Sequence, residues 1–307
     1  LDVDATNLAL VLIALFTLVN VIGSKASASM QLALVVVVLA TMGWFIVDGL
    51  FETASVGFDG SNLDPFFTSG TSGMVAVVGL VFVSYGGLTK VASAAEEVDD
   101  PSHRIPLGMA LSLATATTLY TLGVLVTVAV VPADVLHGDL SPIHTAAEAV
   151  LPKFGAWLVV VAALAAFASA VNAGILAAAR YPMAMARDGL LPAWMGSLSR
   201  FGTPAVGVVL TGAAIAGVVV VFDAEAIAKL ASAFVLLTLG LVNLAVLVLR
   251  ASEIQSYAPA FRSPLYPWTQ LIGIVVSAFL ISQLGFAALV FIGVVVGVGW
   301  AWHHLYA

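Results

Sequence analysis

Two adjacent glycines, Gly86 and Gly87, follow Ser84 and Tyr85 within an apolar run over residues 71–95. Each glycine costs about 1 kcal/mol of helix propensity relative to alanine, so the pair is a candidate point for a helix to unwind. Irregular backbone inside a membrane persists only where it is buried in protein or lines a wet cavity, and its carbonyls can hold a cation or zwitterion. The second interpretation is that both glycines only allow close helix packing, and the local sequence leaves the two open.

Two charged, proline-containing segments come after apolar runs, at residues 95–106 and 180–204. We predict that Pro101 and Pro106 end one helix and begin the next, and that Gly189 ends a short helix. The charged side chains are candidates for ion pairs that close an inner gate, or they only signal topology, since exposed pairs contribute ~0–1 kcal/mol. These gate candidates are Glu96, Glu97, Arg104, Arg180, Arg187 and Asp188.

Ser169 and Asn172 are polar residues in the apolar run 155–180. In one interpretation their side chains face a cavity and bind a cation. In the other they form polar contacts between helices, each of which contributes ~0.6 kcal/mol on average. His137 and His144 are seven residues apart, which does not predict a metal site. The chain has no cysteine and no P-loop, Ser-His-Asp or HExxH pattern. We therefore predict no catalytic residue, no metal and no cofactor, and the protein is not expected to be an enzyme.

The composition is that of a membrane protein. Hydrophobic residues make up 62% of the chain, charged residues 9%, and the mean hydropathy is +1.12. A soluble domain is nearer one-quarter charged, so lipid must be the solvent for most of this surface. The net charge of −7 and the lack of a basic stripe exclude nucleic acid as a partner.

Nine apolar runs have the length of about twenty residues that crosses ~30 Å of hydrocarbon. A helix satisfies its own backbone hydrogen bonds in lipid, whereas a barrel would show alternating segments. We predict an all-α polytopic membrane protein with nine transmembrane helices, the third one broken. The runs are 6–22, 31–51, 71–95, 107–131, 155–180, 204–221, 227–249, 268–284 and 286–304.

The basic residues predict the orientation of these helices. With nine crossings, eight of the ten Lys and Arg residues fall on one side, and only Lys153 and Lys229 fall on the other. The positive-inside rule makes the first side cytoplasmic. The C-terminus is then cytoplasmic and residue 1 lies outside; because residue 1 is Leu rather than Met, we expect an upstream part with an odd number of spans.

Three segments in order resemble the amino acid–polyamine–cation (APC) family of permeases. Phe82–Gly87 followed by Ala95–Pro106 resembles the family's sixth helix and its cytoplasmic end. Arg180–Pro192 with Thr203-Pro204 resembles the loop after the eighth helix. Asn20–Ser27 is similar to the link between helices four and five.

The resemblance implies a partial inverted-repeat fold, in which the nine runs are helices four to twelve of a twelve-helix protein. Residues 1–52 would hold the last two helices of the first repeat, 71–250 the second repeat and 268–304 a C-terminal helix hairpin. The whole chain, 1–307, would be one transmembrane domain from which the first three helices are missing.

The resemblance also implies secondary active transport of amino acids or related amines across the cytoplasmic membrane by alternating access. The ammonium group would meet carbonyls near the broken helix, and no cofactor is implied. A lysine that proton-coupled relatives carry would align near Val38, so exchange, facilitated transport and cation coupling stay open. A defunct or non-transporting fragment, a channel and a receptor are the alternatives. The implied substrate-binding residues are Phe82, Val83, Ser84, Tyr85, Gly86 and Gly87.

Overall fold

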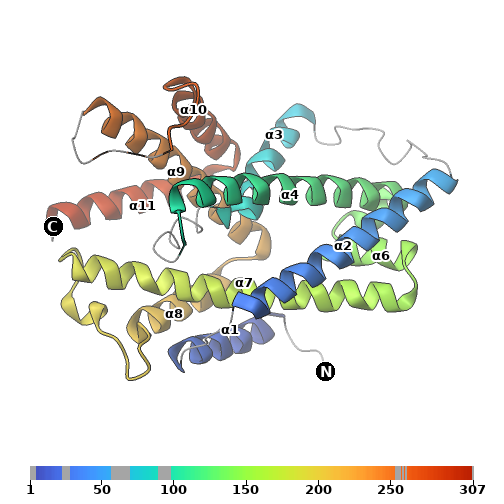
Figure 1. Cartoon of the computed structure of the whole chain (residues 1–307), viewed down its shortest axis with the longest axis horizontal. Coiled ribbons are helices and arrows are strands. Elements are labelled where there is room, and N and C mark those ends of the chain that lie inside the picture. The colour runs from blue at the N-terminus through green and yellow to red at the C-terminus, as the bar shows by residue number, and fades with distance from the viewer. Residues whose placement is uncertain are drawn as a thin grey trace. The chain divides into compact units, whose positions relative to one another are not determined.

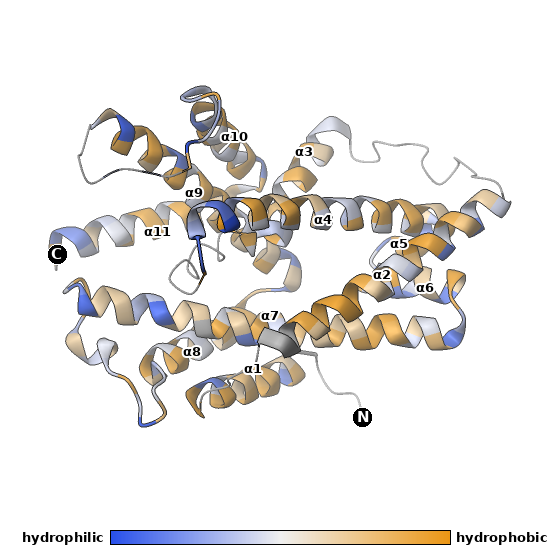
Figure 2. Ribbon diagram, viewed as in Figure 1, coloured by the Kyte–Doolittle hydropathy of each residue, from blue (hydrophilic) through white to orange (hydrophobic). Residues whose placement is uncertain are grey.

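The computed structural model describes residues 5–22, 28–56, 70–88, 98–252, 257, 259 and 261–305, and every regular element in these ranges is a helix (Figure 1). Most of the ribbon in these helices is coloured as hydrophobic in Figure 2, because the apolar runs of the sequence form them. The longer helices are α1 (Ala5–Ile22), α2 (Ala28–Val56), α3 (Gly70–Val81), α4 (Pro101–Val130), α7 (Lys153–Arg187), α8 (Ala205–Val221), α9 (Ala224–Ala251), α10 (Trp268–Gln283) and α11 (Phe286–Leu305). The short ones are η2 (Phe82–Tyr85), α5 (Ala133–Leu136), α6 (Pro142–Val150) and η4 (Ala193–Gly196).

Five of these helices are long and apolar enough to cross a membrane. They lie in α2, α4, α7, α9 and α11. Four shorter apolar helices overlap the other predicted runs, at Thr6–Ile22, Gly70–Tyr85, Ala205–Val221 and Trp268–Gln283. Residues 89–95 of the predicted run 71–95 lie outside the described residues. The predicted class, an all-α polytopic membrane protein, is therefore confirmed, while the crossing of a membrane by all nine runs stays a prediction.

Large apolar side chains cover much of the outer surface of these helices. Leu12 of α1, Val124 of α4 and Val294 of α11 are 43%, 59% and 56% exposed. Soluble proteins rarely expose extensive apolar patches to water, so this surface agrees with a lipid environment.

The chain separates into two compact units, each described here by itself. The first comprises Leu1–Phe66 and Thr115–Gly217, and the second Phe67–Ala114 and Val218–Ala307. In the first unit, α2, α4, α6 and α7 pack around fully buried Phe45 and Val126. In the second, α9, α10 and α11 pack around Leu236, Leu280 and Ala288, among others.

Two prolines lie inside helices, and for Pro106 this corrects the predicted role at a helix boundary. Helix α4 begins at Pro101 and continues through Pro106, while α7 continues through Pro182 to Arg187. A proline removes one backbone hydrogen bond and crowds the preceding turn. Here the helix persists on both sides, because the apolar residues that follow Pro106 and precede Pro182 favour helix in lipid.

The connection 132–153 contains regular structure of its own. It contains α5 and α6, and Ala146 and Ala147 of α6 are fully buried. Helix α6 packs on both α2 and α7, so this connection forms part of the core of the first unit rather than a solvated loop.

Candidate functional site

The α-helical geometry of α3 ends at Val81, and Phe82–Tyr85 form the 3₁₀-helix η2. Gly86 and Gly87 follow as a turn, in which the Gly86 N–H donates to the Val83 carbonyl at 3.1 Å. A 3₁₀-helix has poorer hydrogen-bond geometry than an α-helix, and short stretches of it often mark hinges. The departure from α-helix therefore begins at Phe82, before the glycine pair.

Ser232 of α9 bridges the point where α3 changes into η2. Its hydroxyl donates to the Leu80 carbonyl at 2.6 Å and accepts from the Val83 N–H at 3.2 Å. An uninterrupted α-helix would instead pair these two groups with Ser84 N–H and Gly79 C=O. Ser232 is fully buried, so its hydroxyl meets the requirement that buried backbone groups be paired.

Close packing against neighbouring helices holds the backbone at Gly79, before η2, and at Gly86, after it. A Cβ atom added to Gly79 would lie 3.2 Å from a methyl group of Leu284 and 3.4 Å from the Leu280 carbonyl, so α3 approaches α10 closely there. A Cβ atom added to Gly86 would lie 3.2 Å from the Val83 carbonyl and 3.3 Å from Val235 of α9. Val235 and Ser232 are three residues apart, hence on one face of α9, and this face supports the 3₁₀ segment.

The six predicted substrate-binding residues differ in exposure. Ser84 and Gly87 are exposed, whereas Phe82, Val83, Tyr85 and Gly86 are half-buried. The segment thus presents a hydroxyl-bearing residue on one side while Ser232 and Val235 hold the other. Their contact with a substrate stays a prediction.

Asn172 lies in the first unit, on α7, and meets α1. The Asn20 amide Nδ2 donates to Asn172 Oδ1 at 2.8 Å and also to the Phe16 carbonyl at 2.8 Å. Asn20 is fully buried, and its Oδ1, like Thr17 Oγ1, has no hydrogen-bond partner among the described residues. Ser169 is half-buried one helical turn before Asn172. The geometry of Asn172 is that of a polar helix–helix contact.

The predicted gate residues are only partly described. Glu96 and Glu97 lie outside the described residues. Arg104 is exposed in the first turn of α4, in the second unit. Arg180 and Arg187 are exposed on α7, and Asp188 caps the C-terminus of that helix, all in the first unit.

Gly189 ends α7 in a left-handed conformation, at φ +76°. The Gly189 N–H donates to the Ala186 carbonyl at 3.3 Å, and the Leu190 N–H donates to the Met185 carbonyl at 2.8 Å. This pair of bonds is a Schellman motif, which satisfies carbonyls that the helix end leaves unpaired.

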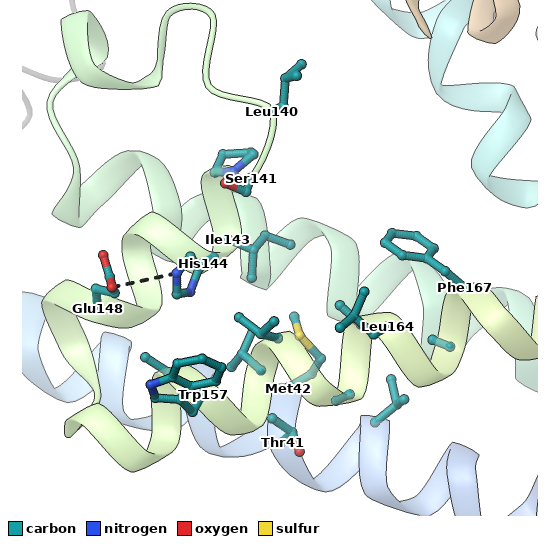
Figure 3. Close-up of a pocket in the computed structure, with 18 of the residues that line it drawn as sticks. Thr41, Met42, Leu140, Ser141, Ile143, His144, Glu148, Trp157, Leu164 and Phe167 are labelled. Atoms are coloured by element: carbon teal, nitrogen blue, oxygen red, sulfur yellow. Dashed lines mark ion pairs between the residues drawn. The ribbon is translucent and has the colours of Figure 1, made fainter. Parts of the chain in front are cut away.

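A cavity of about 800 Å³ lies in the first unit, lined by α2, α7 and the segment around α6. Figure 3 shows Met42, Leu164 and Phe167 along its apolar part and His144 with Glu148 at one end. The His144 Nε2 atom lies 3.6 Å from a Glu148 carboxylate oxygen. The sequence did not predict this cavity, because it depends on the folding of α6 over α2 and α7.

Asp139 organises the chain that enters α6. Its carboxylate accepts hydrogen bonds from Thr145 Oγ1 at 2.6 Å and from the Ser141 N–H at 2.7 Å. Both bonds favour the ionised form, so the Thr145 hydroxyl, followed by the Ser141 amide, lowers the pKa of Asp139 below 3.8.

Comparison with known proteins establishes the family. Residues 3–303 match the family described as amino acid permease. The chain belongs to the amino acid permease family. This permease is 32% identical over 244 residues to the vacuolar cationic amino acid transporter 4 of Arabidopsis thaliana. It is 30% identical over 266 residues to the methylthioribose transporter of Bacillus subtilis and 28% identical over 288 residues to a branched-chain amino acid permease of the same bacterium. The resemblance to the APC family is confirmed.

The matches cover most of this permease but only part of each relative. They include 79% of this chain and 40% of the Arabidopsis transporter, and 86% of this chain and 56% of the methylthioribose transporter. The chain therefore spans about half the length of the curated relatives that it matches.

Proposed function

We propose that the protein carries out secondary active transport of amino acids or related amines across the cytoplasmic membrane. The observation that carries the proposal is the change from α-helix to 3₁₀-helix at Phe82 in a chain of the amino acid permease family. The relatives are named for transport of cationic and branched-chain amino acids and of methylthioribose. The substrate is accordingly a small polar molecule, and an amino acid is the first choice.

The proposed contact is between the substrate ammonium group and backbone carbonyls of η2. The carbonyls of Phe82, Val83 and Ser84 would accept hydrogen bonds from it, with Tyr85, Gly86 and Gly87 completing the binding segment. The Val83 carbonyl already accepts from the Gly86 N–H, but a carbonyl oxygen has a second lone pair. A positive charge beside these dipoles gains more in a site of low dielectric constant than it would in water.

The helices fit the proposed alternating-access mechanism. We propose that α1 and α2 correspond to the fourth and fifth helices of the twelve-helix fold, α3 to α9 to its second repeat, and α10 with α11 to its last two helices. Broken helices at the membrane midplane are where many such transporters hold substrate, while one helix bundle moves against the other. A role in an inner gate stays a proposal for each of the six charged residues predicted from the sequence, which are Glu96, Glu97, Arg104, Arg180, Arg187 and Asp188.

Uptake by the host cell tests this function. We expect deletion of the coding sequence to abolish saturable uptake of at least one labelled amino acid, and re-introduction of the gene to restore it. The panel should include arginine, leucine and alanine, with methylthioribose as a competitor. Unchanged uptake of the whole panel would contradict the proposal. Uptake that rises linearly with concentration would favour a channel, and substrate binding without uptake would favour a receptor or a defunct permease.

A further inference from the structure

The hydroxyl of Ser232 bonds to a different helix from its own. Serine and threonine in a helix commonly donate to the carbonyl four residues earlier in their own helix. Thr238, also on α9, does so with the Phe234 carbonyl at 2.8 Å. The Ser232 hydroxyl donates instead to the Leu80 carbonyl of α3, at 2.6 Å.

The same hydroxyl accepts from the Val83 N–H, which belongs to η2. One side chain thus bonds both to the last turn of the α-helix and to the first turn of the 3₁₀-helix. These are the two backbone groups whose α-helical pairing the change of geometry interrupts. The position of this oxygen therefore sets where α3 stops and η2 begins.

The backbone that carries Ser232 is firmly held. Its neighbour Ala233 and Leu236, one turn later, are fully buried. Both pack in one cluster with Leu280 and Ile281 of α10 and with Leu284, which follows that helix. A hydroxyl on such a support has little freedom to follow the segment that it bonds, so it can dictate the geometry of that segment.

We propose that Ser232 is a positioning residue for substrate binding. By bonding Leu80 and Val83, it fixes the change to 3₁₀ geometry and so directs the η2 carbonyls toward the substrate ammonium group. Ser232 acts through the backbone and makes no contact with substrate itself. The inference rests on the proposed function, because substrate affinity is one of its two readouts.

The first test compares uptake by Ser232→Ala, Ser232→Thr and Thr238→Ala with that of the wild type. We expect Ser232→Ala to raise the KM about tenfold. This is the ratio that the loss of one hydrogen bond of about 1.4 kcal/mol produces. The maximal velocity per folded transporter should be nearly unchanged. Ser232→Thr keeps a hydroxyl and should restore the wild-type KM. Within the described part of the chain the Thr238 hydroxyl bonds only its own helix, so the KM of Thr238→Ala should not change. A Ser232→Ala variant with wild-type KM would overturn the proposal.

The second test measures hydrogen exchange of the backbone amides of Val81–Leu88 in the purified protein, and it does not depend on transport. The Ser232→Ala variant should exchange about tenfold faster in this segment, because the Val83 N–H loses its buried acceptor. The Ser232→Thr and Thr238→Ala variants should exchange like the wild type. If Ser232→Ala does not fold, Ser232→Cys, whose thiol is a weak donor and acceptor of similar shape, should give a smaller rise in both readouts.

The two tests separate the failure of each claim. If the wild type takes up no amino acid, the proposed function fails, and the exchange comparison alone then decides the role of Ser232. If the wild type transports and Ser232→Ala changes neither KM nor exchange, the function stands and the positioning role is refuted.

Discussion

Asn20 donates a hydrogen bond of 2.8 Å to Oδ1 of Asn172, and this bond joins α1 to α7 across 152 positions of sequence. Asn20 is fully buried and Asn172 is half-buried, so the bond is partly shielded from its surroundings. Polar contacts of this kind hold helices together in membranes, where the hydrophobic effect does not draw one apolar helix to another.

The Asn20–Asn172 bond should be measurable in a double-mutant cycle. We expect Asn20→Ala and Asn172→Ala to show a coupling energy of about 0.6 kcal/mol, and at most about 1.7 kcal/mol, in the free energy of unfolding. Asn243→Ala is the control partner, because the Asn243 amide donates to the Leu239 carbonyl of its own helix. A coupling as small for the Asn20–Asn172 pair as for Asn20–Asn243 would contradict the prediction.

Gly207 should not tolerate a side chain. A Cβ atom there would lie 2.5 Å from the Ala179 carbonyl oxygen and 3.1 Å from the Ala179 Cα atom, both of the α7 backbone. We expect Gly207→Ala to lower the free energy of unfolding by about 1–3 kcal/mol, because α7 and α8 must separate.

Gly217→Ala provides the matched control on the same helix. In the ranges that the structure describes, no other atom lies within 4 Å of a Cβ atom added at Gly217. Alanine favours helix by about 1 kcal/mol over glycine, so this variant should be neutral or stabilised. Thermal unfolding of both variants in detergent checks the pair, and equal midpoints would show that the close approach of α7 and α8 is wrong.

A large side chain at Gly86 or Gly87, the two residues after η2, should impair transport. We expect Gly86→Leu and Gly87→Leu both to reduce uptake while leaving membrane insertion intact. Gly86→Leu should have the larger effect, at least tenfold in uptake, because its Cβ atom would press on the Val83 carbonyl and on Val235. Uptake and membrane abundance should be measured together. Unchanged uptake in both variants would remove the proposed site.

Asp139 should titrate below its ordinary range. The folded pKa is lower than 3.8, so the carboxylate stabilises the fold above that pH and loses its contribution as pH falls from 3.8 through the folded value. Thr145→Val removes the 2.6 Å bond, and we expect it to raise the pKa of Asp139 toward 3.8, whereas Thr145→Ser should not. Carboxyl carbon NMR measures the three titrations, and an identical midpoint in all of them would refute the role of Thr145.

The sequence predicted those features of the fold that depend on local composition. The nine apolar runs each overlap an α-helix in the described part of the chain, and Gly189 ends α7 as its freedom at positive φ suggested. The helix boundary predicted at Pro106 is wrong, because α4 continues through this residue and the rule for proline in water underestimates how strongly lipid favours a continued helix.

Tertiary contacts account for what the sequence did not predict. The motif around Gly86 indicated irregular backbone, but the place where it begins depends on Ser232, which is 149 residues from Val83 in sequence. A single serine within α9 carries no local signal that distinguishes it from Thr238. The sequence also does not predict that Asn20 is the partner of Asn172, because the two residues lie on helices that are far apart in the chain.

The most direct test of the proposed function uses the absence of native cysteines from the chain. Ser84 is exposed in η2, and Ser197 is exposed in the segment between α7 and α8. We expect a transported amino acid at saturating concentration to slow thiol modification of Ser84→Cys at least tenfold in liposomes, and to leave Ser197→Cys unchanged, since only bound substrate would cover the 3₁₀ segment. If a substrate that is demonstrably transported protects neither position, binding at Phe82–Gly87 is contradicted.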